Sequence, residues 1–182
     1  MDPNPTGSYR RDFILPTGWE KKRVYLHFDG LYSGAYVWIN GRYIGYTQGG
    51  NNDAEFDISA AVRAGQNNVS IQVVRWTDAS YLEGQDMFHM SGLHRDVYLY
   101  ATPRTSIRDH YITSKLHPES DYTTGEISVA VEMDSRDGSA ARKTVGIRLL
   151  DPQGKVLWEE RKQTRLSVGE QKQSLHFRKA DL

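Results

Sequence analysis

The chain has 182 residues, of which 38% are hydrophobic and 11% aromatic, enough to form a packed core. Lys and Arg total 23 and Asp and Glu total 23, so the balanced charge gives no reason to expect binding to nucleic acid or to a membrane surface. The absence of cysteine excludes disulfides and thiolate chemistry, and no apolar run approaches the ~20 residues of a membrane span or has the layout of a secretory signal.

Short segments rich in Tyr, Val, Ile and Trp recur along the first hundred or so residues, with turn residues between them. Such segments predict β-strands, and their regular spacing predicts an all-β fold. We expect strands at Tyr9 to Leu15, Arg23 to Phe28, Ala35 to Ile39, Arg42 to Thr47, Asn68 to Trp76 and Asp96 to Tyr100. One helical signal is present, in ISAAVRAG, where Ser59 is placed to cap a short turn that Gly65 ends.

The stretch AYVWINGRYIGY predicts a β-hairpin. Asn40-Gly41 supplies the two residues with positive φ that a type I′ turn requires. Pairing outward from this turn sets Ile39 against Arg42, Trp38 against Tyr43, Val37 against Ile44 and Tyr36 against Gly45. One face is then aromatic and the other largely aliphatic, and we expect both faces to be covered, as in a sandwich or jelly roll.

The segment SYLEGQDMFHMSGLHRDV, residues 80–97, separates two of the expected strands. A connection of this length without secondary structure is more often functional or disordered than a simple turn. The nearby acids Asp78, Glu83 and Asp86 are either solvated charges and caps, or members of a carboxylate pair or a cation site. Because apolar residues follow Asp86, we expect its neighbours to be buried and its carboxylate to be paired, coordinated or hydrogen-bonded: Met87, Phe88 and Met90.

Other candidate sites are weaker. His89 and His94 have no carboxylate at metal-ligand spacing, so we expect both to be structural. The sequence has no nucleophile elbow, P-loop or dinucleotide fingerprint, which disfavours nucleophilic and phosphate chemistry. An aromatic strand face can stack on a sugar ring, but aromatic residues on strands are more often core, and we expect core for Tyr36, Trp38, Tyr43 and Tyr46.

A domain boundary is predicted near residue 103, dividing the chain into 1–103 and 104–182. Pro103 cannot donate to a central sheet, and most aromatic residues precede it. Beyond it we expect strands at Ile107 to Leu116, Glu126 to Met133, Thr144 to Leu150, Lys155 to Glu160 and Gln173 to Arg178, with a β-turn at Asp151-Pro152-Gln153-Gly154. These predict an immunoglobulin-like sandwich, truncated because such a sandwich usually has about seven strands.

Several segments together resemble one known family: NPTG at residues 4–7, FDG, WINGRYIGY, EFDIS, RWTDASYLEGQDMF and MSGLHRDV. They resemble the N-terminal sugar-binding jelly roll of glycoside hydrolase family 2, in particular that of the large bacterial β-galactosidases. The resemblance covers about residues 4 to 103, and residues 104 to 182 are similar to the start of the immunoglobulin-like domain that follows. Glucuronidases and mannosidases share this jelly roll, but SYLEGQDMF looks more like the galactosidase version.

The resemblance implies a retaining β-galactosidase whose catalytic glutamates lie on a (β/α)₈ barrel beyond these residues. We therefore expect no catalytic residue here and no activity of this chain alone. By the same resemblance, Asp86 reaches into the active site of that barrel, where it contacts galactose hydroxyls and helps to ligate Na⁺, and Asn4 is a substrate-pocket residue. No cofactor is held by this chain alone; Mg²⁺ is implied only for the full enzyme. The expected partners are a β-galactoside, the barrel of the parent chain and further copies in a homo-oligomer.

Two alternatives to the β-galactosidase hypothesis follow from the residues. The first is a stand-alone carbohydrate-binding module that uses the aromatic strand face. The second is a scaffold or assembly domain without any sugar chemistry.

Overall fold

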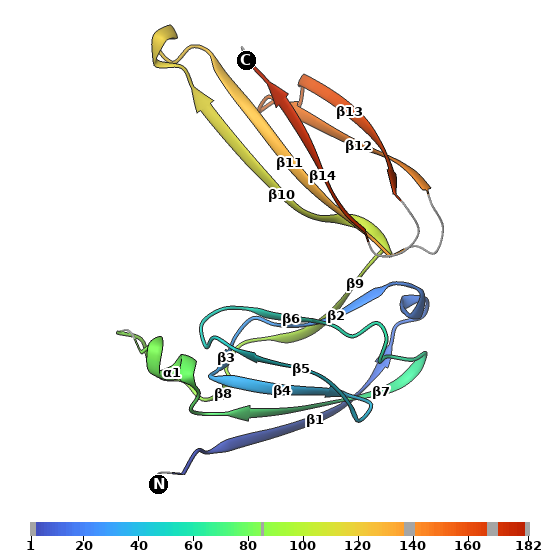
Figure 1. The fold of residues 1–182 in the computed structure, drawn as a ribbon, viewed down its shortest axis with the longest axis vertical. Helices are drawn as coiled ribbons and strands as arrows, with labels where there is room; N and C mark the ends of the chain where they lie inside the picture. The colour runs from blue at the N-terminus through green and yellow to red at the C-terminus, as the bar shows by residue number, and fades with distance from the viewer. Residues whose placement is uncertain (1–2, 85, 137–140, 167–170, 181–182) are drawn as a thin grey trace. The chain divides into compact units, whose positions relative to one another are not determined.

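Strands make up most of the chain in the computed structural model, which describes residues 3–84, 86–136, 141–166 and 171–180 (Figure 1). The chain divides into two units, Met1–Pro103 (unit 1) and Arg104–Leu182 (unit 2). Both units are β-sandwiches, which confirms the predicted all-β fold class. No helix among the described residues is long and apolar enough to cross a membrane.

Unit 1 contains two main antiparallel sheets, with strand orders β1-β7-β4-β5 and β6-β2-β9, and a small sheet of β3 and β8. All six strands expected from the sequence are present, and the strands that were not expected are short: β3, β6 and β8. The elements are β1 (Thr6–Leu15), η1 (Trp19–Lys21), β2 (Arg23–Phe28), β3 (Leu31–Tyr32), β4 (Gly34–Ile39), β5 (Arg42–Gln48), β6 (Ala54–Asp57), β7 (Gly65–Val74), α1 (Asp78–Leu82), β8 (Gly92–Leu93) and β9 (Val97–Thr102).

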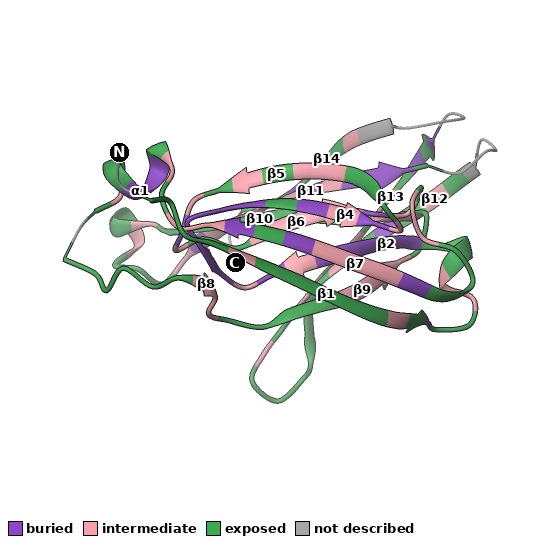
Figure 2. Cartoon of the chain, turned by 90° about the horizontal axis from the view of Figure 1, so that it is seen from below, coloured by how far each residue is buried: buried purple, intermediate pink, exposed green. Residues whose placement is uncertain are grey.

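The core of unit 1 lies between its two main sheets. Alternate residues of β2, β4 and β7 point into it, including the fully buried Val24, Phe28, Val37, Ile39 and Val73. Figure 2 shows these strands with buried positions along their length, whereas β1 is exposed along most of its length. The alternation of side chains along a β-strand thus selects the residues of the core.

The hairpin of β4 and β5 has the predicted turn, with φ of 52° at Asn40 and 79° at Gly41. The first two predicted pairs, Ile39 with Arg42 and Trp38 with Tyr43, are present. Beyond them the predicted register is wrong, because an irregularity at Ile44 shifts the pairing. The pairs are instead Val37 with Gly45 and Tyr36 with Tyr46. A bulge adds one residue to one strand, and the turn residues alone do not specify it.

The short turn expected in ISAAVRAG is present at residues 58–62, where Ile58 O accepts from the amides of Ala61 and Val62. The expected cap is wrong, because the hydroxyl of Ser59 accepts from the amide of Val24 at 2.9 Å. Asn67, 1% exposed, fixes the chain after this turn, because its Nδ2 donates to Arg63 O at 2.7 Å and its Oδ1 accepts from Arg63 N at 2.9 Å.

Unit 2 contains a sheet of β10, β11 and β14 and a two-stranded sheet of β12 and β13. Its elements are β10 (Thr105–Leu116), η2 (Pro118–Ser120), β11 (Gly125–Ser135), β12 (Ala141–Leu150), β13 (Val156–Leu166) and β14 (Gln171–Lys179). The predicted turn at 151–154 is present, with Gly154 N donating to Asp151 O at 2.9 Å. Buried side chains from both sheets, among them Val131, Val145 and Phe177, form a separate core.

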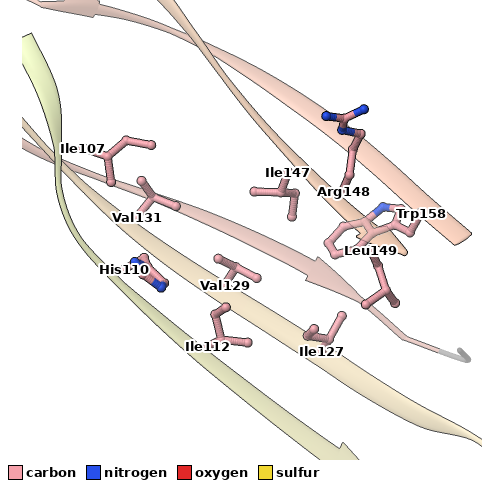
Figure 3. A pocket seen from close by; sticks show the side chains of 10 residues that line it. All are labelled: Ile107, His110, Ile112, Ile127, Val129, Val131, Ile147, Arg148, Leu149 and Trp158. Atoms are coloured by element: carbon pink, nitrogen blue, oxygen red, sulfur yellow. The ribbon is translucent and has the colours of Figure 1, made fainter. Parts of the chain in front are cut away.

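An apolar hollow of about 320 Å³ lies between the two sheets of unit 2. Figure 3 shows Ile112, Val129 and Ile127 on one side of it and Ile147 and Trp158 on the other. Five strands are described in this unit, fewer than the seven or so of a complete immunoglobulin-like sandwich. The immunoglobulin-like assignment of unit 2 stays a prediction.

Candidate functional site

The described residues between β7 and β8 project from the body of unit 1 (Figure 1), and we call residues 78–84 and 86–91 the arm. It begins with α1, a helix that the sequence analysis missed. Thr77 and Ser80 form a capping box, in which Thr77 N donates to Ser80 Oγ at 2.9 Å and Ser80 N donates to Thr77 Oγ1 at 3.4 Å. The T-x-x-S pattern before Tyr81 resembles a capping box and is the sequence signal by which α1 was detectable.

Two side chains of the arm bind the body of unit 1. The carboxylate of Glu83 accepts a hydrogen bond from the amide of Gly50 at 3.2 Å. Nδ1 of His89 shares a hydrogen bond of 3.0 Å with the hydroxyl of Tyr32. The ring of His89 also lies edge-on to Tyr32, with centroids 5.7 Å apart. His89 is thus structural, as predicted, and Glu83 is a structural acceptor rather than a free acid.

Asp86 lies between these two anchored residues and is exposed. The structure records no hydrogen bond or ion pair between its carboxylate and any other described residue, so the expected partner is not supplied by the described part of this chain. The expected burial of its neighbours is wrong as well, since Phe88 is 93% exposed and Met87 and Met90 are half-exposed. The described residues of unit 1 therefore leave much of this apolar surface uncovered.

The exposed apolar surface extends to α1, where Tyr81 is 89% and Leu82 81% exposed. A hollow of about 520 Å³ lies beside them, lined by Trp76, Thr77, Ser80, Tyr81, Gly84 and His89. Its wall combines aromatic rings with the aliphatic hydroxyl groups of Thr77 and Ser80. Both hydroxyls are already engaged, because Thr77 Oγ1 donates to Ser33 Oγ and Ser80 Oγ donates to Thr77 O. The free surface that it offers is therefore mainly aromatic.

Asn4 lies at the same end of unit 1 as the arm. Its Nδ2 donates to the carbonyl of Trp76 and its Oδ1 accepts from the amide of Trp76, both at 2.9 Å. The ring of Trp76 is in turn 6.3 Å from the ring of His89, centroid to centroid. Asn4 is thus connected through Trp76 to His89 of the arm, whereas no contact of Asp86 with these residues is recorded.

The aromatic strand face is a second candidate. Tyr36, Tyr43 and Tyr46 are exposed and Trp38 is partly exposed, so the expectation that these residues belong to the core is wrong. They pack against one another instead, with the rings of Tyr36 and Tyr46 4.7 Å apart and those of Trp38 and Tyr43 5.8 Å apart. Burial raises the pKa of Tyr46, with smaller contributions from Tyr36 and Asp78. Only the aliphatic face of this hairpin is covered in the described structure.

No group of three or more His, Asp or Glu side chains is placed to hold a metal ion among the described residues. The three acids near the arm do not converge either. Asp78 lies in the first turn of α1, Glu83 binds Gly50, and Asp86 is exposed. Among these three acids, Asp78 and Asp86 are exposed with no recorded hydrogen-bond or ion-pair partner in the described residues, and Asp86 is the one that lies next to the exposed apolar side chains of Met87 and Phe88.

Comparisons with known proteins identify relatives over both units. Residues 1–103, which are unit 1, match the family described as "Glycosyl hydrolases family 2, sugar binding domain". A β-galactosidase of Priestia megaterium is 39% identical over 170 residues, which are 93% of this chain and 16% of that protein. A β-galactosidase of Yersinia pestis is 43% identical over 135 residues, 74% of this chain and 13% of that protein. The chain thus spans about one sixth or less of these relatives.

Solved structures of similar fold include a β-glucuronidase of Bacteroides uniformis, with a TM-score of 0.85, 22% identity and coverage of 97% of this chain and 22% of that one. A putative β-galactosidase of Bacteroides fragilis has a TM-score of 0.82 and 23% identity, covering 99% of this chain and 28% of that one. At these identities the likeness shows the fold alone.

Proposed function

Because the chain belongs to glycosyl hydrolase family 2, we propose that it is the non-catalytic N-terminal part of a β-galactosidase and that its arm completes a sugar pocket built by another part of the polypeptide. The names of the curated relatives support hydrolysis of β-galactosides. The single observation that carries the role of the arm is the exposed carboxylate of Asp86, for which the described residues supply no partner.

The apolar surface around Asp86 supports a partner at this place. Phe88, Tyr81 and Leu82 leave most of their area in water, although unit 1 has a core that buries comparable side chains. Large apolar side chains exposed in this way are typical of a contact site. When a neighbouring domain covers it, the same contact removes water around Asp86 and strengthens hydrogen bonds to its carboxylate.

The chemistry of glycoside hydrolysis explains why the catalytic groups are expected elsewhere. A retaining enzyme needs two carboxyl groups about 5 to 5.5 Å apart on the two sides of the glycosidic bond. Among the described acids of the arm, Glu83 is bound to a backbone amide and Asp86 has no second acid beside it. Asp86 is suited instead to accept hydrogen bonds from sugar hydroxyls, which orients the substrate.

The charge of Asp86 favours a neutral sugar over a uronic acid. A galactoside presents hydroxyl groups, each of which can donate to a carboxylate, whereas a glucuronide carries a carboxylate of its own. Two like charges brought together in a closed pocket repel each other and disfavour the wrong substrate. This supports a galactoside as substrate, even though several proteins of similar fold are β-glucuronidases.

A sodium ion in this pocket would find only one ligand in the described residues. Asp86 has a free carboxylate, a hard oxygen donor of the type that such a cation takes. No further acidic or imidazole group converges with it in the described structure, so these residues do not form a metal site by themselves. Asp86 is therefore at most one of several ligands that such an ion needs.

The proposal is tested by transferring this chain into a relative. The matching 170 residues of the Priestia megaterium β-galactosidase are replaced by this chain, and hydrolysis of a chromogenic β-galactoside is compared for this chimera, the parent enzyme and the chain alone. We expect activity from the chimera and none from the chain alone. Turnover by the chain alone that disappears in Asp86→Ala would show that the chemistry lies within these residues.

A stand-alone carbohydrate-binding module is the second candidate, and the exposed aromatic strand face favours it. Tyr36, Trp38, Tyr43 and Tyr46 offer ring faces on one side of a rigid hairpin, where a sugar can stack. Calorimetric titration of the chain with galactose and lactose distinguishes the two functions. Binding in the millimolar range or tighter that is lost in Trp38→Ala favours the module, and no binding favours the incomplete pocket.

A further inference from the structure

Two hydrogen bonds fix the arm to unit 1, and they are placed symmetrically about Asp86. Glu83 lies three residues before Asp86, and His89 lies three residues after it. Glu83 accepts from the amide of Gly50 at 3.2 Å, and His89 bonds to the hydroxyl of Tyr32 at 3.0 Å. Each side of Asp86 is therefore tied to the body of the unit by one side chain.

Both bonds end on the same small surface, the pair Tyr32 and Gly50. Both residues are buried, and they pack directly on each other. A methyl group added at Gly50 would overlap the ring of Tyr32, so only glycine allows the ring to lie this close. The amide of Gly50, which donates to Glu83, and the hydroxyl of Tyr32, which bonds to His89, are therefore held by the same close packing. A shift of one of these two groups requires a shift of the other.

The remaining contacts reinforce the same geometry. The ring of His89 lies against Tyr32 at 5.7 Å and against Trp76 at 6.3 Å, centroid to centroid. The capping box of α1 fixes the chain just before Glu83. Asp86 itself makes no recorded bond to a described residue that could hold its position. Its place in space is accordingly set by the residues on either side of it.

We propose that Glu83 and His89 are positioning residues, which act through the pair Tyr32 and Gly50 to present the carboxylate of Asp86 in a fixed place before any partner binds. The effect of these anchors on catalysis rests on the proposed function of Asp86. The anchoring of the arm is independent of that function, because it involves residues of this chain alone. A carboxylate held in advance loses less conformational freedom when sugar binds, so the anchors raise the efficiency of the pocket without touching substrate.

The test uses the complete 182-residue chain, labelled with ¹⁵N for backbone relaxation and amide exchange. Tyr32→Phe removes the hydroxyl that bonds to His89 and keeps the ring packed on Gly50. Glu83→Ala removes the carboxylate that accepts from the amide of Gly50. Glu83→Gln restores an acceptor oxygen without the charge. Tyr43→Phe and Glu20→Ala are matched controls, since both residues are exposed and no bond is recorded from either side chain to another described residue.

We expect an order parameter near 0.85 at Asp86 in the unsubstituted chain, falling below about 0.6 in Tyr32→Phe combined with Glu83→Ala. The amide of Gly50 should exchange about fivefold faster in Glu83→Ala, the factor expected for one lost hydrogen bond, and Glu83→Gln should restore it. The melting temperature should change little, because Glu83 and His89 lie outside the hydrophobic core. An order parameter at Asp86 that is already low in the unsubstituted chain, or that the double variant leaves unchanged, refutes the anchoring.

Kinetics in the chimera separate this inference from the proposed function. If both are correct, Tyr32→Phe and Glu83→Ala each lower kcat/KM about tenfold while Glu83→Gln recovers most of the loss, and Asp86→Ala has a larger effect. If Asp86→Ala has no effect on kcat/KM, the proposed function fails, and the relaxation data still decide whether the anchors order the arm.

Discussion

Asn4 pairs with Trp76 as one strand residue pairs with another: its side-chain amide donates to the carbonyl and accepts from the amide of the same residue, both at 2.9 Å. The bond joins the segment before β1 to the segment before α1, which are 72 positions apart in the chain. The resemblance implies a substrate contact for Asn4. The structure shows that this side chain already has a positioning role, since it fixes Trp76 beside the arm.

Asn4→Ala is therefore expected to lower stability modestly. It leaves two exposed backbone groups of Trp76 to water, at a cost of about 1 kcal/mol or less, which corresponds to a few degrees in melting temperature. Thermal unfolding followed by circular dichroism measures this effect. Asn4→Asp keeps the acceptor and loses the donor, so its melting temperature should lie between those of the other two proteins, and an unchanged value for Asn4→Ala would contradict the pairing.

Asn67→Ala is expected to be among the most destabilising polar substitutions in unit 1. The buried amide bonds to Arg63, Gly65 and Asn40, with the Asn40 Nδ2 donating to Asn67 Oδ1 at 2.8 Å. Its loss leaves several buried polar groups unpaired, which costs about 2 to 4 kcal/mol. Urea unfolding gives the value. Asn68→Ala is the neighbouring control, because its side chain bonds at the exposed edge with Asp12, and it should cost clearly less.

The strands were predictable because their signal is local. A run of strand-forming residues between turn residues locates β2 to the residue, and Asn40-Gly41 specifies the turn between β4 and β5. The bulge at Ile44 and the short strands β3 and β8 depend on distant partners. No window of a few residues contains that information.

The candidate site was predictable only in part. The resemblance identifies Asp86 as a candidate site residue. The apolar side chains next to it predict burial, but these side chains are exposed. A sequence shows that a residue is apolar without showing whether its partner belongs to the same unit. The bond between Tyr32 and His89, 57 positions apart, has no local pattern at all. The prediction that the aromatic strand face belongs to the core is wrong for a related reason. Aromatic rings can pack against one another on an exposed face as well as beneath a second sheet.

Phe88→Ser is expected to separate docking from folding. Because this side chain is 93% exposed, the substitution should leave the melting temperature of the chain within a degree or so. In the chimera it should lower kcat/KM, since an apolar contact with the neighbouring domain is lost. Ile14→Ser, at an exposed position of β1, is the control and should leave kcat/KM unchanged. Equal activity of both variants would show that no partner covers Phe88.

Unit 2 offers a prediction on pH. The hydrogen bond from Arg178, with Nη2 2.6 Å from the carboxylate of Glu126, lowers the pKa of Glu126 below its ordinary value. The ionised carboxylate thus contributes stability above the pKa of the unfolded chain, and this contribution is lost as the pH falls through the lower, folded pKa. Glu126→Gln should therefore melt below the unsubstituted chain at neutral pH. At about pH 3 the difference between their melting temperatures should be smaller, and a constant difference would contradict the ion pair.

The most direct test of the account is kcat/KM for a β-galactoside in the chimera carrying Asp86→Ala, with its melting temperature as the control. The carboxylate has no recorded bond to a described residue, so the substitution should leave stability unchanged. We predict a fall in kcat/KM of about a hundredfold or more, as expected for a polar contact that strengthens in the transition state. An unchanged kcat/KM in a stably folded chimera would contradict the placement of Asp86 in the sugar pocket.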